Sequence, residues 1–276
     1  MRLHHFLVAL FLLAAPPTPI VAQTPRAIAA DTVVVPNGTV RLRALLWMPD
    51  GPGPFPAVLF NPGAGCRIPP AVATRAAGFA PTFVRHGYSV LILFRRGDGL
   101  SADQGKCMGD LLRSEEAAKG QEARNQLQLV LLTTDHLSDV IAGVSFLRSL
   151  AKVDAKRIGV VGHSFGGQLT LLAAEHDPTI RAVVTFAAAA ASWDGSPELR
   201  TRLLAAVREA TVPVMLVHAA DDSSTAPAYA LAGELSRLGK RHVLKILPDH
   251  GHGAVYTAIA QWETDVFRFL DDYVRR

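Results

Sequence analysis

Five residues of this sequence, Gly-His-Ser-Phe-Gly at positions 162–166, could present a serine hydroxyl on a sharp turn. An apolar run at 157–161 precedes them and a helical pattern at 167–174 follows. A G-x-S-x-G pattern between a strand and a helix is typical of a nucleophile elbow, where close backbone approach requires the glycines. Ser164 is therefore a candidate nucleophile. The N–H of Phe165, at the start of the helix, is a candidate donor to a developing oxyanion.

A serine hydroxyl needs a base to take its proton and an acid to orient that base. In elbow proteins the acid and the histidine follow the serine in that order. The acid is expected just after a predicted strand at 212–217, where Asp221 and Asp222 are adjacent. We prefer Asp222, and we expect the other carboxylate to bond only its local backbone.

The base is expected in the loop that follows a predicted strand at 242–247. This loop contains His250 and His252 among several glycines. Ligands of open parallel sheets bind at the carboxyl ends of the strands, which is where this loop begins. We prefer His252 to His250.

A second oxyanion donor is expected from the loop after the predicted strand at 57–60. The loop reads Asn-Pro-Gly-Ala-Gly-Cys at 61–66, and Pro62 has no N–H. Ala64 is the preferred donor and Gly65 is the next choice.

The elements that must position these residues alternate between strands and helices, which predicts a mostly parallel sheet covered on both faces. An Asn-Gly pair at 37–38 predicts a tight hairpin at the start. We expect further strands at 32–35, 39–48, 88–94, 157–161 and 182–186, and helices at 71–86, 111–132, 138–150, 197–209, 226–238 and 255–274. Gly120 is a weak point of the helix expected at 111–132. Residues 97–109 are expected to form a loop. No internal repeat or linker is evident, so one domain is predicted.

Composition excludes several function classes. The chain has 276 residues, of which 49% are hydrophobic and 19% charged, as expected for a globular protein. Its net charge is +4, and lysine and arginine are scattered, so nucleic-acid binding has little support. Asp249, His250 and His252 lack the spacing of a metal site, so no metal or other cofactor is expected.

The N-terminus predicts export. Arg2 precedes an apolar run at 6–15, then prolines and a small-residue site near Ala22, which is typical of a signal peptide. The run is too short for a permanent membrane span, so stable membrane insertion is not expected. We predict a signal peptide at 1–23, a mature domain at 24–276, and a periplasmic or secreted location.

Residues 32–275 resemble the α/β-hydrolase family, and within it the exported dienelactone-hydrolase-like and prolyl-oligopeptidase-like serine hydrolases. The resemblance rests on the segments at 56–60, 94–101, 153–167, 218–222 and 248–253. It implies a single-domain fold with an eight-stranded sheet and hydrolysis of a small-molecule carboxylic ester through an acyl-enzyme. The family's acid commonly lies four residues after a strand-ending histidine, which supports Asp222. Its base commonly precedes a glycine, which supports His252.

The sequence also departs from the family pattern. Pro62-Gly63 stands where the family usually has His-Gly, and Ala219 stands where glycine is usual. Residues 103–135 exceed a minimal core and are interpreted as a partial lid. Cys66 and Cys107 follow strands that are neighbours in the family, so an exported protein could bridge them in a disulfide.

The sequence leaves more than one interpretation of two arginines, and it leaves two alternatives to an ester hydrolase. Arg95 and Arg96 could bind an acidic substrate group, but buried ion pairs that fix their loop are preferred. A small serine peptidase or aminoacyl-ester hydrolase is an alternative function, although the related exopeptidases carry a large β-rich domain for which 276 residues leave no room. A non-catalytic binding protein is disfavoured because every position of the triad is filled.

Overall fold

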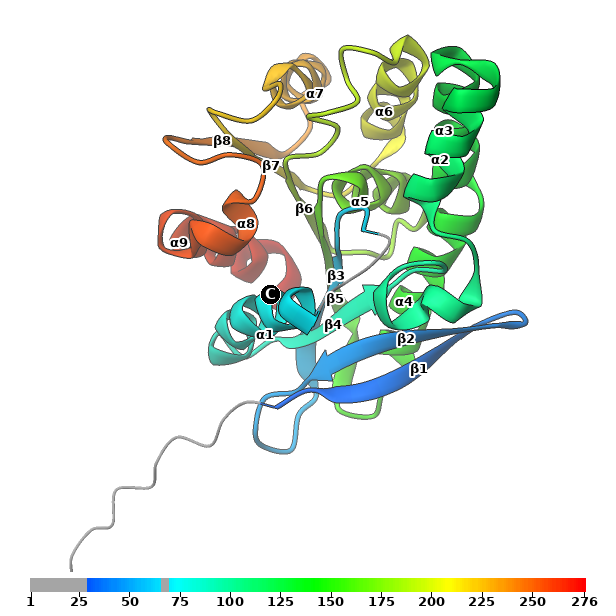
Figure 1. Cartoon of the computed structure of the whole chain (residues 1–276). Helices are drawn as coiled ribbons and strands as arrows, with labels where there is room; N and C mark the ends of the chain where they lie inside the picture. The colour runs from blue at the N-terminus through cyan, green and yellow to red at the C-terminus, as the bar shows by residue number, and fades with distance from the viewer. Residues whose placement is uncertain (1–28, 66–69) are drawn as a thin grey trace, which may run out of the picture.

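An eight-stranded sheet forms the centre of the molecule (Figure 1). The structure, a computed structural model, describes residues 29–65 and 70–276, and the side chains of 70–77 are not described. The strand order is β1-β2-β4-β3-β5-β6-β7-β8. The strands are β1 (Asp31–Asn37), β2 (Val40–Trp47), β3 (Phe55–Asn61), β4 (Ser89–Phe94), β5 (Val153–His163), β6 (Ala182–Phe186), β7 (Val214–Ala219) and β8 (His242–Leu247). The predicted signal peptide lies outside the described residues.

Strand direction confirms the expectation of a mostly parallel sheet. β3 through β8 pair in parallel, while β2 pairs antiparallel with both β1 and β4. Every residue of β4, β6 and β7 is buried, which explains their continuous apolar sequences. Because β3 and β5 to β8 point the same way, the loops after these strands meet at one edge of the sheet.

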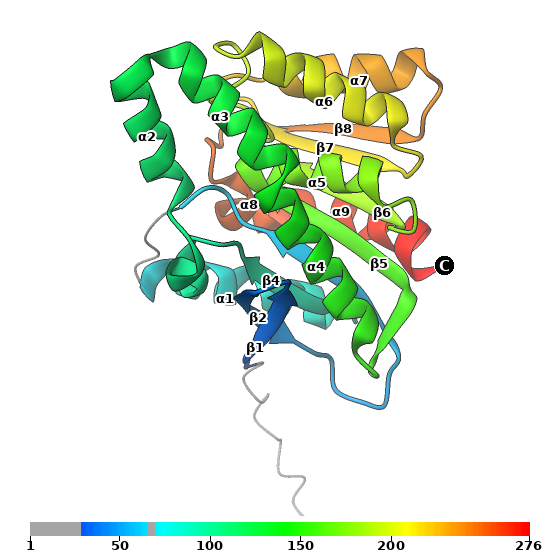
Figure 2. The same ribbon diagram turned by 90° about the vertical axis from the view of Figure 1, so that its right-hand side faces the viewer.

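Helices cover both faces of the sheet (Figure 2). One core lies under α1 and α9 and is rich in aromatic side chains, including Phe79, Phe83 and Trp262. The other lies under α4 to α7 and is mainly aliphatic. The helices are α1 (Pro70–Arg85), α2 (Met108–Lys119), α3 (Gln121–Thr133), α4 (Asp135–Ser149), α5 (Phe165–His176), α6 (Pro197–Glu209), α7 (Ala226–Arg237), α8 (Ala254–Thr257) and α9 (Ile259–Leu270).

Three local predictions were wrong. The two-residue hairpin loop is Gly38-Thr39 and not Asn37-Gly38, because Asn37 pairs with Val40 in the ladder. Residues 97–109 are not all loop, since a short 3-10 helix, η1 (Gly99–Gln104), lies within them and α2 begins at Met108. The predicted helix at 111–132 is broken at Gly120, whose φ of 88° no helix can accommodate.

The last predicted helix, at 255–274, is also interrupted. α8 ends at Thr257, and Ala258 adopts φ −114° and ψ 32° before α9 begins. A five-residue π-helical segment, η2 (Asp271–Arg275), follows α9. Ala258 is buried, so packing overrides the strong helical preference of alanine here.

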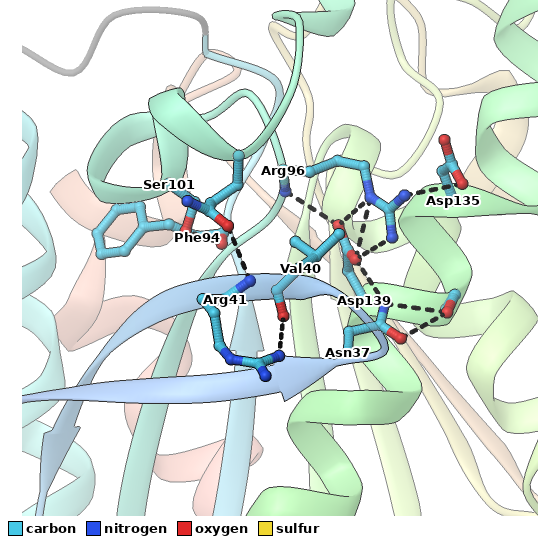
Figure 3. A network of polar contacts seen from close by, with 10 residues as sticks. Asn37, Val40, Arg41, Phe94, Arg96, Ser101, Asp135 and Asp139 are labelled. Atoms are coloured by element: carbon cyan, nitrogen blue, oxygen red, sulfur yellow. Dashed lines mark hydrogen bonds and ion pairs between the residues drawn. The ribbon is translucent and has the colours of Figure 1, made fainter.

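A polar network ties the β1–β2 hairpin to α4 and to the loop after β4 (Figure 3). The Asn37 side-chain amide donates to Asp139 Oδ1 at 2.8 Å. Arg96 donates to both carboxylate oxygens of the fully buried Asp139 and pairs with Asp135 at 2.8 Å. Bidentate pairs of this kind fix geometry as well as charge, so the start of the loop after β4 is held firmly.

By length and composition, the stretch Gln121–Ser149, which comprises α3 and α4, would be able to cross a membrane. This is weak evidence for a span, because α4 packs on β5 and α5 as a core helix does.

Candidate active site

Ser164 lies on the tight turn between β5 and α5, as the motif predicts. Its backbone has φ 55° and ψ −120°, a combination that costs free energy for a residue with a side chain. The turn is held by the Ser164 N–H, which donates to Phe186 O in β6 at 2.8 Å.

The two glycines of the motif are required by close backbone contacts. A Cβ on Gly162 would lie 2.3 Å from Gly166 O, and a Cβ on Gly166 would lie 2.1 Å from Asn61 O. Both distances are far below van der Waals contact. A larger residue at 162 would therefore clash with the first turn of α5, and one at 166 would push the turn away from the end of β3.

Three predicted residues converge at this turn. His252 Nε2 lies 2.8 Å from Ser164 Oγ, and His252 Nδ1 lies 2.9 Å and 3.0 Å from the carboxylate oxygens of Asp222. Asp222 follows β7, and His252 lies between β8 and α8. With Nδ1 donating to the carboxylate, Nε2 is left free to accept the proton of the serine hydroxyl.

The structure brings Asp222 and His252 to the serine and not their neighbours. The Asp222 side chain is 1% exposed, whereas Asp221 is exposed. Burial opposes ionisation of Asp222, but hydrogen bonds from His252 and the Ser223 N–H hold its pKa below its ordinary value. His250 contacts the Gln261 amide and not the serine.

Two further histidines, both buried, support this arrangement. His163 Nε2 donates to the backbone carbonyl of His252 at 2.7 Å, and burial lowers the pKa of His163 to about 4, so the ring is neutral. His218 Nε2 lies 3.6 Å from Asp222 Oδ2, and burial lowers its pKa too. The position of His163 directly before Ser164 was the signal that could have revealed its role.

The two predicted oxyanion donors come from the loop after β3 and from α5. Phe165 is the first residue of α5, so its N–H has no partner within the helix. Ala64 lies in the loop after β3, where a Cβ on Gly63 would be 3.2 Å from Ser164 Cβ. The loop is therefore in contact with the serine despite Pro62 standing in place of the usual histidine.

Arg95 fixes the loop after β3 by hydrogen bonds to its backbone carbonyls. Its guanidinium donates to Pro62 O at 2.8 Å and to Gly63 O at 3.2 Å, and it pairs with Asp98 at 3.0 Å. The Gly63 carbonyl and the Ala64 N–H belong to one trans peptide and point in opposite directions. Because Arg95 binds the carbonyl, it turns the Ala64 N–H away from itself.

Arg95 and Arg96 thus confirm the preferred interpretation of buried ion pairs that fix the loop. Arg95 is 1% exposed, and its guanidinium also lies 5.4 Å from the centre of the Phe165 ring. Burial raises the pKa of Asp98 above its ordinary value, although the charge and hydrogen bond of Arg95 oppose this shift.

Two pockets open on either side of Ser164. The histidine-side pocket has a volume of about 210 Å³, and among its lining residues are Pro62, Leu93, Phe94, His163, His252 and Tyr256. The other pocket has a volume of about 290 Å³ and lies beneath α2 and α3, so we call it the hairpin-side pocket after the helical hairpin that these two helices form. Among its lining residues are Leu112, Glu116, Arg124, Gln128, Gln168 and Ser192. Ala64 and Ser164 line both pockets.

The segment interpreted as a partial lid, 103–135, contains the α2–α3 helical hairpin that forms this wall. α3 is held to the loop after β6 by Asn125, which donates to Gly195 O at 2.7 Å, and by Gln128, which donates to Ser192 Oγ at 3.3 Å. The hairpin is thus fastened beside the serine, and its role as a lid stays a prediction.

The predicted disulfide and the expected absence of a metal both stay predictions. Cys107 lies immediately before α2, but Cys66 is outside the described residues, so their disulfide stays a prediction. Within residues 29–65 and 70–276, no group of three or more histidine, cysteine, aspartate or glutamate side chains could hold a metal ion.

A sequence model of the dienelactone hydrolase family matches residues 42–260. The chain belongs to the dienelactone hydrolase family. Membership supports a hydrolase activity, and the eight-stranded fold agrees with it.

The individual proteins that this chain resembles match it over a short segment or at low sequence identity. A protein of Methylorubrum extorquens named as a carboxymethylenebutenolidase is 38% identical over 50 residues, or 18% of this chain and 17% of that protein. Acylaminoacyl peptidase of Pyrococcus horikoshii superposes with a TM-score of 0.67 at 15% identity over 91% of this chain, which spans 42% of that chain. A dienelactone hydrolase of Anabaena variabilis superposes with a TM-score of 0.61 at 20% identity over 89% of this chain and 98% of that one. At these identities the two structures show a shared fold.

Proposed function

We propose that the protein is a serine hydrolase that cleaves small-molecule carboxylic esters through an acyl-enzyme. The observation that carries the proposal is the continuous chain of contacts from Ser164 Oγ through His252 to Asp222. Each catalytic role of an activated serine has one matching group here.

In the first step, Ser164 Oγ forms a bond to the ester carbonyl carbon while its proton passes to His252 Nε2. Asp222 stabilises the resulting imidazolium, and the N–H groups of Ala64 and Phe165 bind the oxyanion. The C–O bond then breaks, and His252 returns the proton to the leaving alcohol. Water repeats the sequence on the acyl-enzyme, with His252 as base, and releases the carboxylic acid.

The test is a Ser164→Ala variant assayed with p-nitrophenyl acetate and butyrate and with a fluorophosphonate probe. We expect loss of turnover and of labelling with an unchanged circular dichroism spectrum. Labelling that persists in the variant would contradict the assignment. A folded wild-type protein that neither turns over esters nor reacts with the probe would favour a non-catalytic binding protein.

A peptidase or aminoacyl-ester hydrolase remains the alternative within the same chemistry. The Pyrococcus acylaminoacyl peptidase shares the fold, but this chain covers less than half of it. Comparing an aminoacyl ester with the matching peptide amide distinguishes the two, because an amide leaving group is harder to expel.

We further propose that the protein acts outside the cytoplasm. The basic residue, apolar run and small-residue site at 1–23 support export. N-terminal sequencing of the protein recovered from the periplasm or medium would test this. Protein found only in the cytoplasm, with its N-terminus at residue 1, would contradict it.

A further inference from the structure

We infer that the hairpin-side pocket is the acyl site of the esterase, and that it selects acyl groups carrying a hydroxyl or N–H donor near the ester carbonyl. This inference rests on the proposed function and names its substrate class. It follows from the place of His252 relative to the two pockets and from one buried amide, that of Gln168.

The position of His252 decides which pocket holds which half of the ester. The leaving alcohol must lie next to His252 Nε2, because that nitrogen returns the proton to it. His252 lines the histidine-side pocket and is absent from the described lining of the hairpin-side pocket. Ala64 and Ser164 lie at the junction, where the carbonyl carbon must sit. The alcohol therefore occupies the histidine-side pocket, and the acyl chain extends beneath α2 and α3.

The chemistry of the hairpin-side pocket differs from that of its counterpart. Leu93, Phe94 and Tyr256 give the histidine-side pocket an apolar wall. The hairpin-side pocket instead combines apolar Leu112 with the amide of Gln128 and several charged or hydroxyl groups. Its two arginines are paired locally, Arg113 with Asp110 and Arg124 with Glu116, so the pocket has no unbalanced charge for an anionic group. It fits a neutral acyl group with polar substituents.

Gln168 supplies the specific requirement. It is 2% exposed, and its side-chain carbonyl oxygen has no hydrogen-bond partner among the described residues. A buried acceptor without a donor is costly, so a ligand that donates to it gains binding energy. The acceptor can be satisfied only by an O–H or N–H group.

The placement of Gln168 sets where the donor must be. It lies four residues after Ser164, and its N–H donates to Ser164 O at 3.1 Å across the first turn of α5. Helical side chains tilt toward the helix N-terminus, so that of Gln168 leans toward the nucleophile. The matching donor is accordingly on the second or third carbon of the acyl group, as in hydroxyacyl esters.

The first test compares ethyl esters that share one leaving group. Ethyl 3-hydroxybutanoate carries the donor, ethyl 3-methylbutanoate is its isostere without oxygen, and ethyl 3-methoxybutanoate keeps the oxygen without the donor. We expect kcat/KM to be about tenfold higher for the hydroxy ester than for either control, the gain from one neutral hydrogen bond. In Gln168→Met, which keeps the side-chain length, this ratio should fall to near one.

The second test separates the acyl from the alcohol side. Ala191 is exposed and lines the hairpin-side pocket, so Ala191→Phe should narrow it without disturbing the core. We expect kcat/KM for ethyl 3-phenylpropanoate to fall at least tenfold relative to ethyl acetate, while the ratio for benzyl acetate to ethyl acetate stays constant. Ala118→Phe, on an exposed position of α2 outside the described pocket linings, is the matched control.

These outcomes separate the inference from the proposed function. Hydrolysis of all esters with no preference for the hydroxy ester would overturn the donor requirement. A change in the benzyl acetate ratio in Ala191→Phe would overturn the acyl assignment. Absence of any ester hydrolysis would overturn the proposed function and this inference with it.

Discussion

Replacing Asp222 by asparagine should nearly abolish turnover while leaving the fold intact. The carboxylate lies 2.9 Å from His252 Nδ1 and its side chain is 1% exposed. An asparagine amide can donate to Nδ1, which moves the ring proton to Nε2, the nitrogen that must accept the serine proton. The variant also loses the charge that stabilises the imidazolium.

The size of the effect follows from that geometry. A carboxylate and an imidazolium about 3 Å apart attract by ~5 kcal/mol at an effective dielectric constant of ~20. This corresponds to a loss of about 10⁴-fold in kcat, the size expected when such an acid is removed from a triad. The assay is kcat for p-nitrophenyl butyrate, with thermal unfolding as a check on the fold.

Asp221 is the matched control, because it is adjacent in sequence and exposed. Asp221→Asn should stay within about twofold of wild type, as expected for an exposed position away from the reacting groups. A folded Asp222→Asn protein within tenfold of wild type would refute the reasoning. So would equal losses in the two variants.

Three further predictions concern groups around the site. Arg95→Lys should lower kcat about 10²-fold with little change in KM. Arg95 reaches Pro62 O through one terminal nitrogen and Gly63 O and Asp98 through the other, and the single nitrogen of lysine cannot occupy both positions. An unchanged kcat would exclude a role of Arg95 in orienting the oxyanion loop. Burial lowers the pKa of His136 to about 3 from 6.5, so its contribution to stability is complete above pH 6.5 and is lost as the pH falls toward 3. The free energy of unfolding, measured with denaturant between pH 6 and 5, should therefore change less steeply with pH in His136→Asn than in wild type, by ~1.4 kcal/mol per pH unit. Equal slopes in the two proteins would contradict this. Non-reducing mass spectrometry of exported protein should find a Cys66–Cys107 bridge, and two free thiols would rule it out.

The strand pattern was largely legible from the sequence, because a strand buried on both faces must be apolar throughout. The segments at 182–186 and 242–247 were predicted with their observed bounds, and β4 differs by one residue. Helix interruptions were harder to predict. Gly120 was recognised as a weak point, but nothing in the local sequence marks Ala258 as the end of a helix.

The candidate site shows the same division. Serine, acid and histidine could be assigned to loops at strand ends, since parallel strands bring those loops to one edge. Adjacent candidates such as Asp221 and Asp222 could be ranked but not separated by pattern. The role of His163 was missed because it acts through the backbone carbonyl of His252, which is distant in the chain. The ion pair of Arg95 was anticipated, but its hydrogen bonds to the loop after β3 were not, because they also go to backbone carbonyls of a distant segment.

The sequence by itself determined that Ser164 would stand on a tight turn between a strand and a helix, because glycines at 162 and 166 and the apolar runs around them are local features. Only the tertiary structure decided which carboxylate and which histidine reach that serine. A shift of one residue in a loop turns a side chain from the site toward solvent, and loop conformation depends on contacts far away in the chain. The two pockets have the same origin, since their walls come from the packing of α2, α3 and α8 around Ser164.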